Sequence, residues 1–208
     1  MSLFFESIKI ENGKPANIFF HNERINKARR DLLKINNQLN LENIISIPQD
    51  LKNIVYKCRV FYDYEIHKIE FVEYEKKNIK KLIAVNANEI SYGYKFTDRS
   101  AIDKLKLENT NSAEEDILII KNDIVTDTSF SNVLFYDGKD WFTPKECLLP
   151  GTQRAKMLSE KRVIERSIKR DDLFQYKKIK LINAMVEFDY AATLSTDSII
   201  VKDKNDRR

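Results

Sequence analysis

Four short segments of this chain contain the residues best suited to chemistry. They are HNERI at residues 21–25, KFTDR at 95–99, TDTSFSNVLF at 126–135 and LPGTQR at 149–154. Lys95 supplies an amine that can form a Schiff base, provided that a rigid element holds it toward a pocket. A helix that starts after Gly151 would present free backbone N–H groups and a favourable dipole to a phosphate. Arg24 could add a bidentate guanidinium to such a phosphate site.

Each of these residues also has an ordinary structural interpretation. A single lysine in a lysine-rich chain usually lies on the surface. Asp127, between two threonines, could cap a turn, and Arg24 could be a solvent-facing helix residue. The chain has only four glycines, and two of them, Gly93 and Gly151, lie outside any predicted hairpin and next to the segments of interest. The order of the four segments is therefore more informative than any one of them.

In that order, and over nearly the whole chain, the segments resemble the class IV aminotransferases and aminodeoxychorismate lyases, which use pyridoxal 5'-phosphate (PLP). That family has H-x-x-R-[LI] at its first helix, a lysine at a strand end, T/S-E leading to N-x-F, and an L-P-G-x-x-R turn. FESIK at residues 5–9 is similar to its F-E-T-I-R strand. The resemblance implies the fold type IV architecture, an α+β fold with two domains and the cofactor between them.

The resemblance also implies a role for each site residue. Lys95 would hold PLP and move protons at the substrate carbon. Asp127 would keep the pyridine nitrogen protonated, although the family usually has the longer glutamate there. The phosphate would be bound by residues from three segments: Arg24, Gly151, Thr152, Gln153 and Asn183. The family more often has an aliphatic residue and then threonine where this chain has Thr152 and Gln153.

Lys9 and Arg99 are the candidates for substrate binding. Lys9 ends the FESIK segment, whose family counterpart faces the pocket, and it could attract a substrate carboxylate. Arg99, four residues after Lys95, resembles the lyase branch, since branched-chain aminotransferases usually have tyrosine there. The family normally has a strand and loop before F-E-T-I-R, whereas this chain starts almost at that motif. We therefore expect part of the usual pocket wall to be missing or replaced.

The favoured reaction is the 4-amino-4-deoxychorismate lyase reaction of folate biosynthesis, which gives 4-aminobenzoate and pyruvate. One alternative is a class IV aminotransferase that acts on a branched-chain or D-amino acid. A second is a non-catalytic binding protein on the same fold, against which Lys95, Asp127 and Arg24 argue.

The positions of apolar and turn residues predict the elements that carry these segments. Asn12-Gly13 and Asp137-Gly138 indicate tight hairpin turns. Ile25, Ala28, Leu32 and Ile35 form a helical stripe starting from about Asn22, and strands are expected near residues 54–62, 66–74 and 81–85. A short helix with Ile102 and Leu105, three strands over 114–144, a helix over 152–159 and a strand over 178–186 follow. We place a small N-terminal α+β domain at residues 1–88 and a larger β-rich domain at 89–208.

Composition limits the remaining possibilities. The chain has 36 basic and 32 acidic residues, a net charge of +4, and these charges alternate along it, so nucleic-acid binding is not favoured. Two cysteines and two histidines indicate neither a disulfide framework nor a metal site. No apolar run approaches the roughly 18 residues of a spanning helix. We expect an untargeted cytoplasmic homodimer with a small-molecule substrate and a frayed tail after residue 201.

Overall fold

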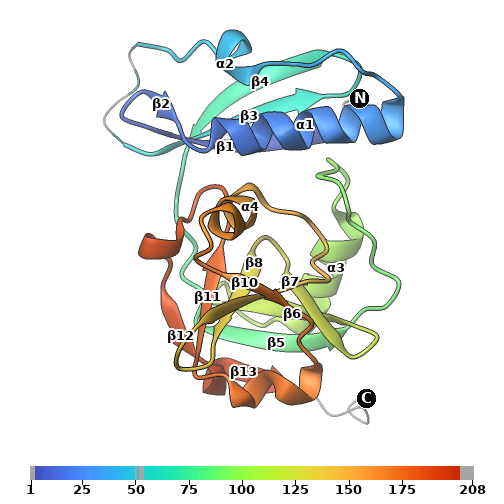
Figure 1. The fold of residues 1–208 in the computed structure, drawn as a ribbon, viewed down its shortest axis with the longest axis vertical. Helices are drawn as coiled ribbons and strands as arrows, with labels where there is room; N and C mark the ends of the chain where they lie inside the picture. Colours follow the sequence, from blue (N-terminus) through green and yellow to red (C-terminus); the bar gives the residue numbers. More distant parts are fainter. Residues whose placement is uncertain (1–2, 50, 52–53, 202–208) are drawn as a thin grey trace. The chain divides into compact units, whose positions relative to one another are not determined.

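A computed structural model describes residues 3–49, 51 and 54–201. The chain divides into two compact units (Figure 1). Unit 1 comprises Met1–Glu75 and Tyr94–Asp98, and unit 2 comprises Lys76–Gly93 and Arg99–Arg208. The expected frayed tail after residue 201 lies outside the described residues.

Unit 1 is a four-stranded antiparallel sheet with one long helix on it. Its elements are β1 (Phe4–Glu11), β2 (Lys14–Pro15), α1 (Ile18–Leu33), α2 (Leu41–Ile44), β3 (Tyr56–Tyr62) and β4 (Ile66–Glu73), and the strand order is β2-β1-β3-β4. The turn between β1 and β2 is the predicted Asn12-Gly13 pair, with φ of 51° and 69°. These two positive φ values are those of a type I′ hairpin turn, which asparagine and glycine adopt most easily.

Helix α1 differs from the predicted one in its start and in its buried face. It begins at Ile18, not near Asn22, and its N-cap residue Asn17 adopts a left-handed conformation shortly after the hairpin. Its buried residues are His21, Ile25, Ala28 and Arg29. Leu32, predicted to lie on the apolar stripe, is 41% exposed, and Ile35 follows the end of the helix. Two positions of the buried face are thus polar, which a search for apolar spacing cannot detect.

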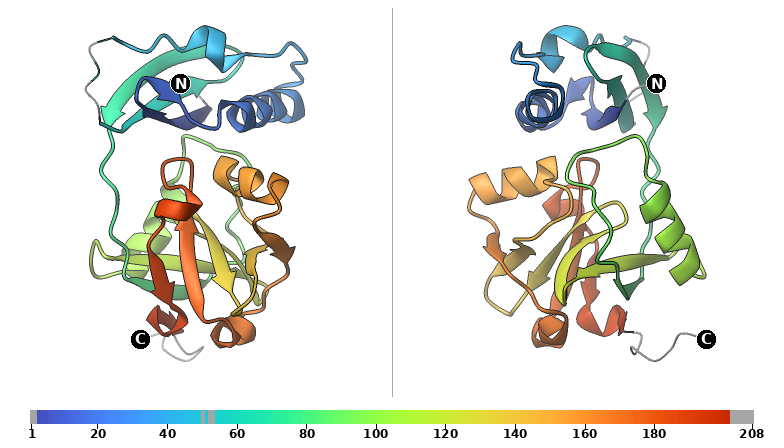
Figure 2. Two further views of the ribbon diagram at one scale, coloured as in Figure 1. Left: turned by 60° about the vertical axis from the view of Figure 1, so that its left-hand side comes forward. Right: turned by 90° about the vertical axis from the view of Figure 1, so that its right-hand side faces the viewer.

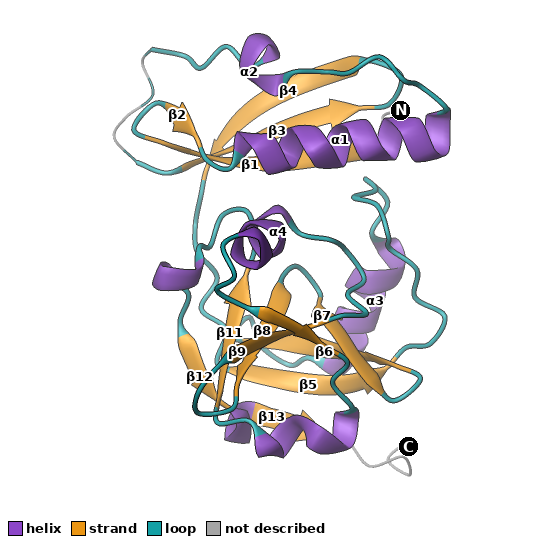
Figure 3. Ribbon diagram, in the orientation of Figure 1, coloured by secondary structure: helices purple, strands orange, loops and turns teal. Residues whose placement is uncertain are grey.

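Unit 2 is built on a nine-stranded mixed sheet (Figures 2 and 3). The strands are β5 (Lys81–Asn86), β6 (Glu115–Lys121), β7 (Ile124–Thr128), β8 (Asn132–Tyr136), β9 (Trp141–Pro144), β10 (Ile164–Arg166), β11 (Lys178–Ile182), β12 (Thr193–Ser195) and β13 (Ile199–Val201). The main path is β10-β9-β8-β7-β6-β5-β13, and β11 pairs with β8 and β12. Its helices are α3 (Ser100–Asn109) and α4 (Thr152–Ser159), and three short 3-10 helices span Arg170–Gln175, Phe188–Tyr190 and Thr196–Ser198.

Strand β5 belongs to unit 2, whereas the sequence placed the domain seam after it, near residue 88. It runs parallel to β6 and to β13, so its partners are distant in the chain. The side chains of β6 are buried on both faces. Leu118 and Ile120 belong to the main core with Phe135, while Ile117 and Ile119 pack on the other face beneath Leu105 of α3.

The predicted strand and helix positions in unit 2 need two corrections. Residues 114–144 form four strands, not three, because a turn at Ser129–Ser131 separates β7 from β8. The late strand ends at Ile182, and residues 183–186 form a turn instead. The predicted helix over residues 152–159 is confirmed. Within the described part of the chain, no helix is long and apolar enough to cross a membrane.

Candidate active site

In unit 1, Lys95 lies on a short segment held against the edge of β1. The Phe5 N–H donates to the Lys95 carbonyl at 3.0 Å, and the Thr97 N–H donates to the Leu3 carbonyl at 3.0 Å. Because side chains alternate along an extended segment, Phe96 packs on Phe4 in the core while Lys95 projects to the opposite face. Its Nζ lies 4.4 Å from the centre of the Phe5 ring. Lys95 is thus a half-buried amine on a backbone fixed by strand pairing.

Arg24 lies on α1 and forms a buried cluster with Glu6 and His21. Its Nε and Nη2 donate to the two oxygens of Glu6 at 2.8 and 2.5 Å, and His21 Nδ1 lies 2.6 Å from Glu6 Oε2. Although burial acts to raise it, Arg24 and His21 together lower the pKa of Glu6 to about 2. Burial lowers the pKa of His21 despite the opposing effect of Glu6. A neutral His21 therefore donates its Nδ1–H to an ionised Glu6.

This cluster bears on the predicted phosphate role of Arg24. A guanidinium has five N–H donors, and Arg24 uses its Nε and Nη2 to bind Glu6, so its phosphate role stays a prediction. Glu6 itself was not among the predicted site residues. The available signal was its phase in the strand, since Phe4, Glu6, Ile8 and Ile10 all point inward, so a carboxylate there must meet buried donors.

In unit 2, the Asp127 carboxylate is buried at the end of β7. Its Oδ1 accepts from Asn132 Nδ2 and its Oδ2 from the Leu149 N–H, both at 2.8 Å. Burial raises its pKa to about 6, and the hydrogen bonds from Leu149 and Asn132 oppose that rise only in part. Asn132 Nδ2 also donates to the Leu149 carbonyl at 2.9 Å. Asp127 is therefore bound to the loop that leads into α4.

The same loop places Gly151 directly against Asn132. A Cβ at Gly151 would lie 2.0 Å from Asn132 Oδ1, so no side chain fits there. Gly151 precedes the first turn of α4, in which Thr152 and Gln153 are buried. The structure thus brings Asp127 and Gly151 together at Asn132, which the sequence identified only as part of N-x-F, and Thr152 and Gln153 follow Gly151 in the first turn of α4.

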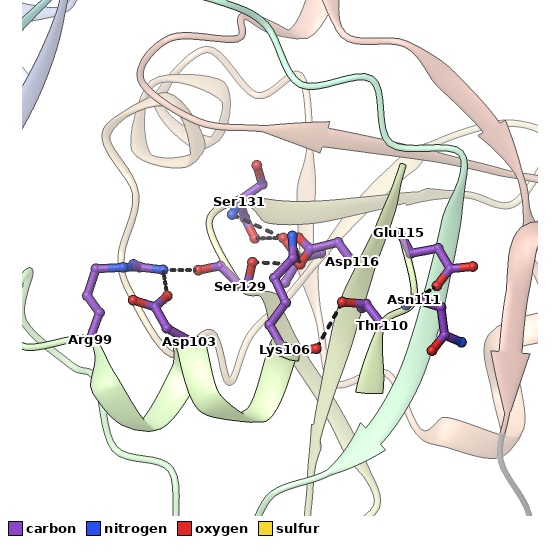
Figure 4. A network of polar contacts seen from close by, with 10 residues as sticks. Arg99, Asp103, Lys106, Thr110, Asn111, Glu115, Asp116, Ser129 and Ser131 are labelled. Atoms are coloured by element: carbon purple, nitrogen blue, oxygen red, sulfur yellow. Dashed lines mark hydrogen bonds and ion pairs between the residues drawn. The ribbon is translucent and has the colours of Figure 1, made fainter. Parts of the chain in front are cut away.

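The remaining predicted residues are bonded within the protein. The Asn183 side chain accepts from the Met185 and Val186 N–H groups and donates to Ser131 Oγ at 2.9 Å, so it forms a turn. Arg99 Nη2 donates to the Ser129 carbonyl at 2.7 Å and lies 3.2 Å from Asp103 (Figure 4). In unit 1, Lys9 Nζ donates to Glu11 at 2.8 Å, and only 7% of the Lys9 side chain is exposed. The predicted substrate roles of Lys9 and Arg99 stay predictions.

Comparison with known proteins gives the family. Residues 3–188 match the family model of the amino-transferase class IV proteins. The chain therefore belongs to the class IV aminotransferase family, and its fold is that of the fold type IV PLP enzymes, as the four sequence segments predicted.

Three similar proteins illustrate the relationship. An uncharacterized protein of Haemophilus influenzae is 39% identical over 186 residues, which cover 87% of this chain and 96% of that protein. A "putative 4-amino-4-deoxychorismate lyase" from Haemophilus somnus, known from a crystal structure, is 33% identical in sequence and has a TM-score of 0.82. The match covers 89% of this chain and 97% of that one. A hypothetical aminotransferase from Mycobacterium tuberculosis in its PLP-bound form has a TM-score of 0.74 at 14% identity, over 93% of this chain and 80% of its own, and shows the fold alone.

Proposed function

We propose that this protein is a PLP-dependent 4-amino-4-deoxychorismate lyase, which forms 4-aminobenzoate and pyruvate. The observation that carries the proposal is the placement of Lys95, an amine fixed by backbone bonds to β1 on the sheet face opposite the core. The name given to the Haemophilus somnus protein, which is similar over nearly its whole length, supports the choice of a lyase.

The residues present fit the cofactor. Asp127 accepts hydrogen bonds from Asn132 and from the Leu149 N–H, and a carboxylate has about four lone-pair sites, so it could also accept from a pyridine N–H. A pyridinium beside this carboxyl would favour its ionised form and so oppose the effect of burial on its pKa. The start of α4 and the Arg24 guanidinium are suitable donors for the phosphate. When bound, PLP supplies an electron sink for the charge that develops at the substrate carbon.

The protein's own residues then have defined tasks. Lys95 would hold PLP until the substrate amine takes its place, and the Lys95 amine would then remove the proton from the carbon that bears nitrogen. Asp127, as a carboxylate, would keep the pyridine nitrogen of bound PLP protonated. Removal of the carbon-bound proton by Lys95 would let the bond to the enolpyruvyl oxygen break as the substrate ring becomes aromatic, and protonation of the released enolpyruvate would give pyruvate.

A class IV aminotransferase is the second candidate, because the matching family model is named for that activity. The two reactions differ in the final acceptor of the proton. In transamination Lys95 would return the proton to the cofactor and a keto acid would leave, so an added keto acid would be needed to complete the cycle. In the lyase reaction no acceptor is needed.

The experiment uses purified protein incubated with PLP. We expect a yellow protein in which borohydride links the cofactor to Lys95, as a peptide map would show, and 4-aminobenzoate from aminodeoxychorismate without added keto acid. Lys95→Ala should abolish both results, and Lys104→Ala, which changes a 75% exposed side chain, should abolish neither. Labelling at another lysine would contradict the assignment. Turnover of amino acids that depends on 2-oxoglutarate, with no 4-aminobenzoate formed, would replace the lyase with the aminotransferase.

The proposal includes a homodimer and a cytoplasmic location, and light scattering of the purified protein tests the first.

A further inference from the structure

The turn between β7 and β8 determines where the Asp127 carboxylate lies. Asp127 of β7 pairs with Asn132 of β8, and the turn Ser129–Ser131 lies between them. The Thr128 N–H donates to the Ser131 carbonyl at 2.9 Å, and the Ser131 N–H donates to Thr128 Oγ1 at 3.1 Å. A displacement of this tight turn would therefore move Asp127 and Asn132 together.

Three groups from elsewhere in unit 2 hold the turn, and two of them, Arg99 and Asp116, are labelled in Figure 4. Arg99 Nη2 donates to the Ser129 carbonyl at 2.7 Å, and Asn183 Nδ2 donates to Ser131 Oγ at 2.9 Å. The shortest of the three bonds joins Ser129 Oγ to Asp116 Oδ1 at 2.6 Å. Asp116 lies on β6, so this last bond ties the turn to a central strand.

The ring at the centre of the turn adds a fourth restraint. Phe130 lies near two ammonium groups, with Lys77 Nζ 4.6 Å and Lys106 Nζ 5.4 Å from the ring centre. Lys106 Nζ is also 3.1 Å from Asp116 Oδ1, so one lysine contacts both the ring and the carboxylate. Lys106 of α3 and Asp116 of β6 thus restrain the ring and the Ser129 hydroxyl, and Arg99, directly before α3, binds the backbone of the turn.

Burying the Asp116 carboxylate has a high desolvation cost, which a purely structural position does not require. It is fully buried, and its Oδ2 has no hydrogen-bond partner among the described residues. Replacing a buried charged pair by apolar residues is often neutral or stabilising, and buried polar groups are normally satisfied. Departures from such rules are expected where function requires a particular geometry.

We propose that Asp116 is a positioning residue that fixes the Ser129–Ser131 turn through Ser129 and thereby sets the position of the Asp127 carboxylate. Arg99 restrains the same turn through its hydrogen bond to the Ser129 carbonyl. The inference rests on the proposed function only for the contact between Asp127 and the pyridine nitrogen.

The first test follows the titration of Asp127 by carboxyl ¹³C NMR in protein without cofactor, with the signal assigned by its loss in Asp127→Asn. Ser129→Ala removes the hydroxyl that Asp116 binds and changes no charge. Arg154 and Cys147, the ionisable groups that interact with Asp127, stay in place. We expect the pKa of Asp127 to fall from about 6 toward its usual range, because a loosened turn admits water and burial is the main cause of the high value.

Asp116→Asn should shift the titration in the same direction. Asp103→Asn is the matched control, since Asp103 also lies beside Arg99 but its side chain is 62% exposed, and the titration should not change. If Asp116→Asn does not fold, Ser129→Ala decides the question. An unchanged titration in Ser129→Ala, with lower resistance to urea, would show that Asp116 has only a structural role.

PLP affinity is the second readout. The loss of one buried hydrogen bond should weaken binding roughly tenfold in Ser129→Ala and leave Asp103→Asn at the wild-type value. Wild-type affinity in Ser129→Ala would contradict the positioning role. If the wild-type protein takes up no PLP, the proposed function fails, while the titration of Asp127 still decides whether Asp116 positions it.

Discussion

Replacing Gly151 with alanine places a methyl group where the Asn132 side chain lies. The new Cβ would be 2.0 Å from Asn132 Oδ1 and 3.2 Å from its Cγ. Backbone conformation does not require glycine here, because Gly151 has φ of −71° and ψ of 147°, which any residue adopts. The need for glycine comes entirely from the close approach of Asn132, so the alanine must displace that side chain.

The cost follows from what Asn132 does. Its Nδ2 donates to the Asp127 carboxylate and to the Leu149 carbonyl, and both bonds lie in a buried region. Overpacking of a core typically costs about 1–3 kcal/mol, and a hydrogen bond to a charged group contributes about 1.5–3 kcal/mol. We expect Gly151→Ala to lower the free energy of unfolding by about 3–5 kcal/mol if the bond to Asp127 is lost.

Urea unfolding of the cofactor-free protein measures this cost. Gly93→Ala is the matched control, since a Cβ there meets no atom within 4 Å, and it should change the free energy of unfolding by less than about 0.5 kcal/mol. In a protein that already carries Asn132→Ala, Gly151→Ala should change the free energy of unfolding very little, because the atoms that clash with the new Cβ are gone. A Gly151→Ala protein within about 1 kcal/mol of wild type would refute the reasoning.

Two further predictions concern buried carboxylates with opposite pKa shifts, and both use cofactor-free protein. Glu6 has a pKa lowered from 4.5 to about 2. Its ionised form therefore contributes about 3 kcal/mol to the free energy of unfolding above pH 4.5, and this contribution is lost as the pH falls toward 2. Glu6→Gln should therefore unfold more easily at pH 7 and show a flatter loss of stability in acid; equal acid sensitivity in both proteins would contradict this. Asp127 has a pKa raised from 3.8 to about 6, so the wild type should lose about 3 kcal/mol as pH rises between those values. The free energy of unfolding of Asp127→Asn should not fall over this pH range. If wild type and Asp127→Asn instead show parallel stability curves from pH 4 to 7, the pKa of Asp127 is not raised.

The sequence alone determined the elements that depend on local spacing. The Asn12-Gly13 turn follows from the ease with which these residues adopt positive φ, and α4 follows from the Pro150-Gly151 break before a helix-forming run. The family was likewise predictable, because its motifs are short and keep their order along the chain. None of these features requires knowledge of which strands pair.

Only the tertiary structure decided which groups meet. Periodicity indicates which face of an element is apolar, but it does not indicate what packs on that face, so Glu6 as the partner of Arg24 and the exposure of Leu32 were not predictable. The parallel pairing of β5 with β6 joins segments distant in sequence, and because of it β5 belongs to unit 2 and not to the predicted N-terminal domain. The contacts of Asn132 with Asp127 and Gly151 depend on a loop that returns to a strand end, and such non-local contacts have no local sequence signal.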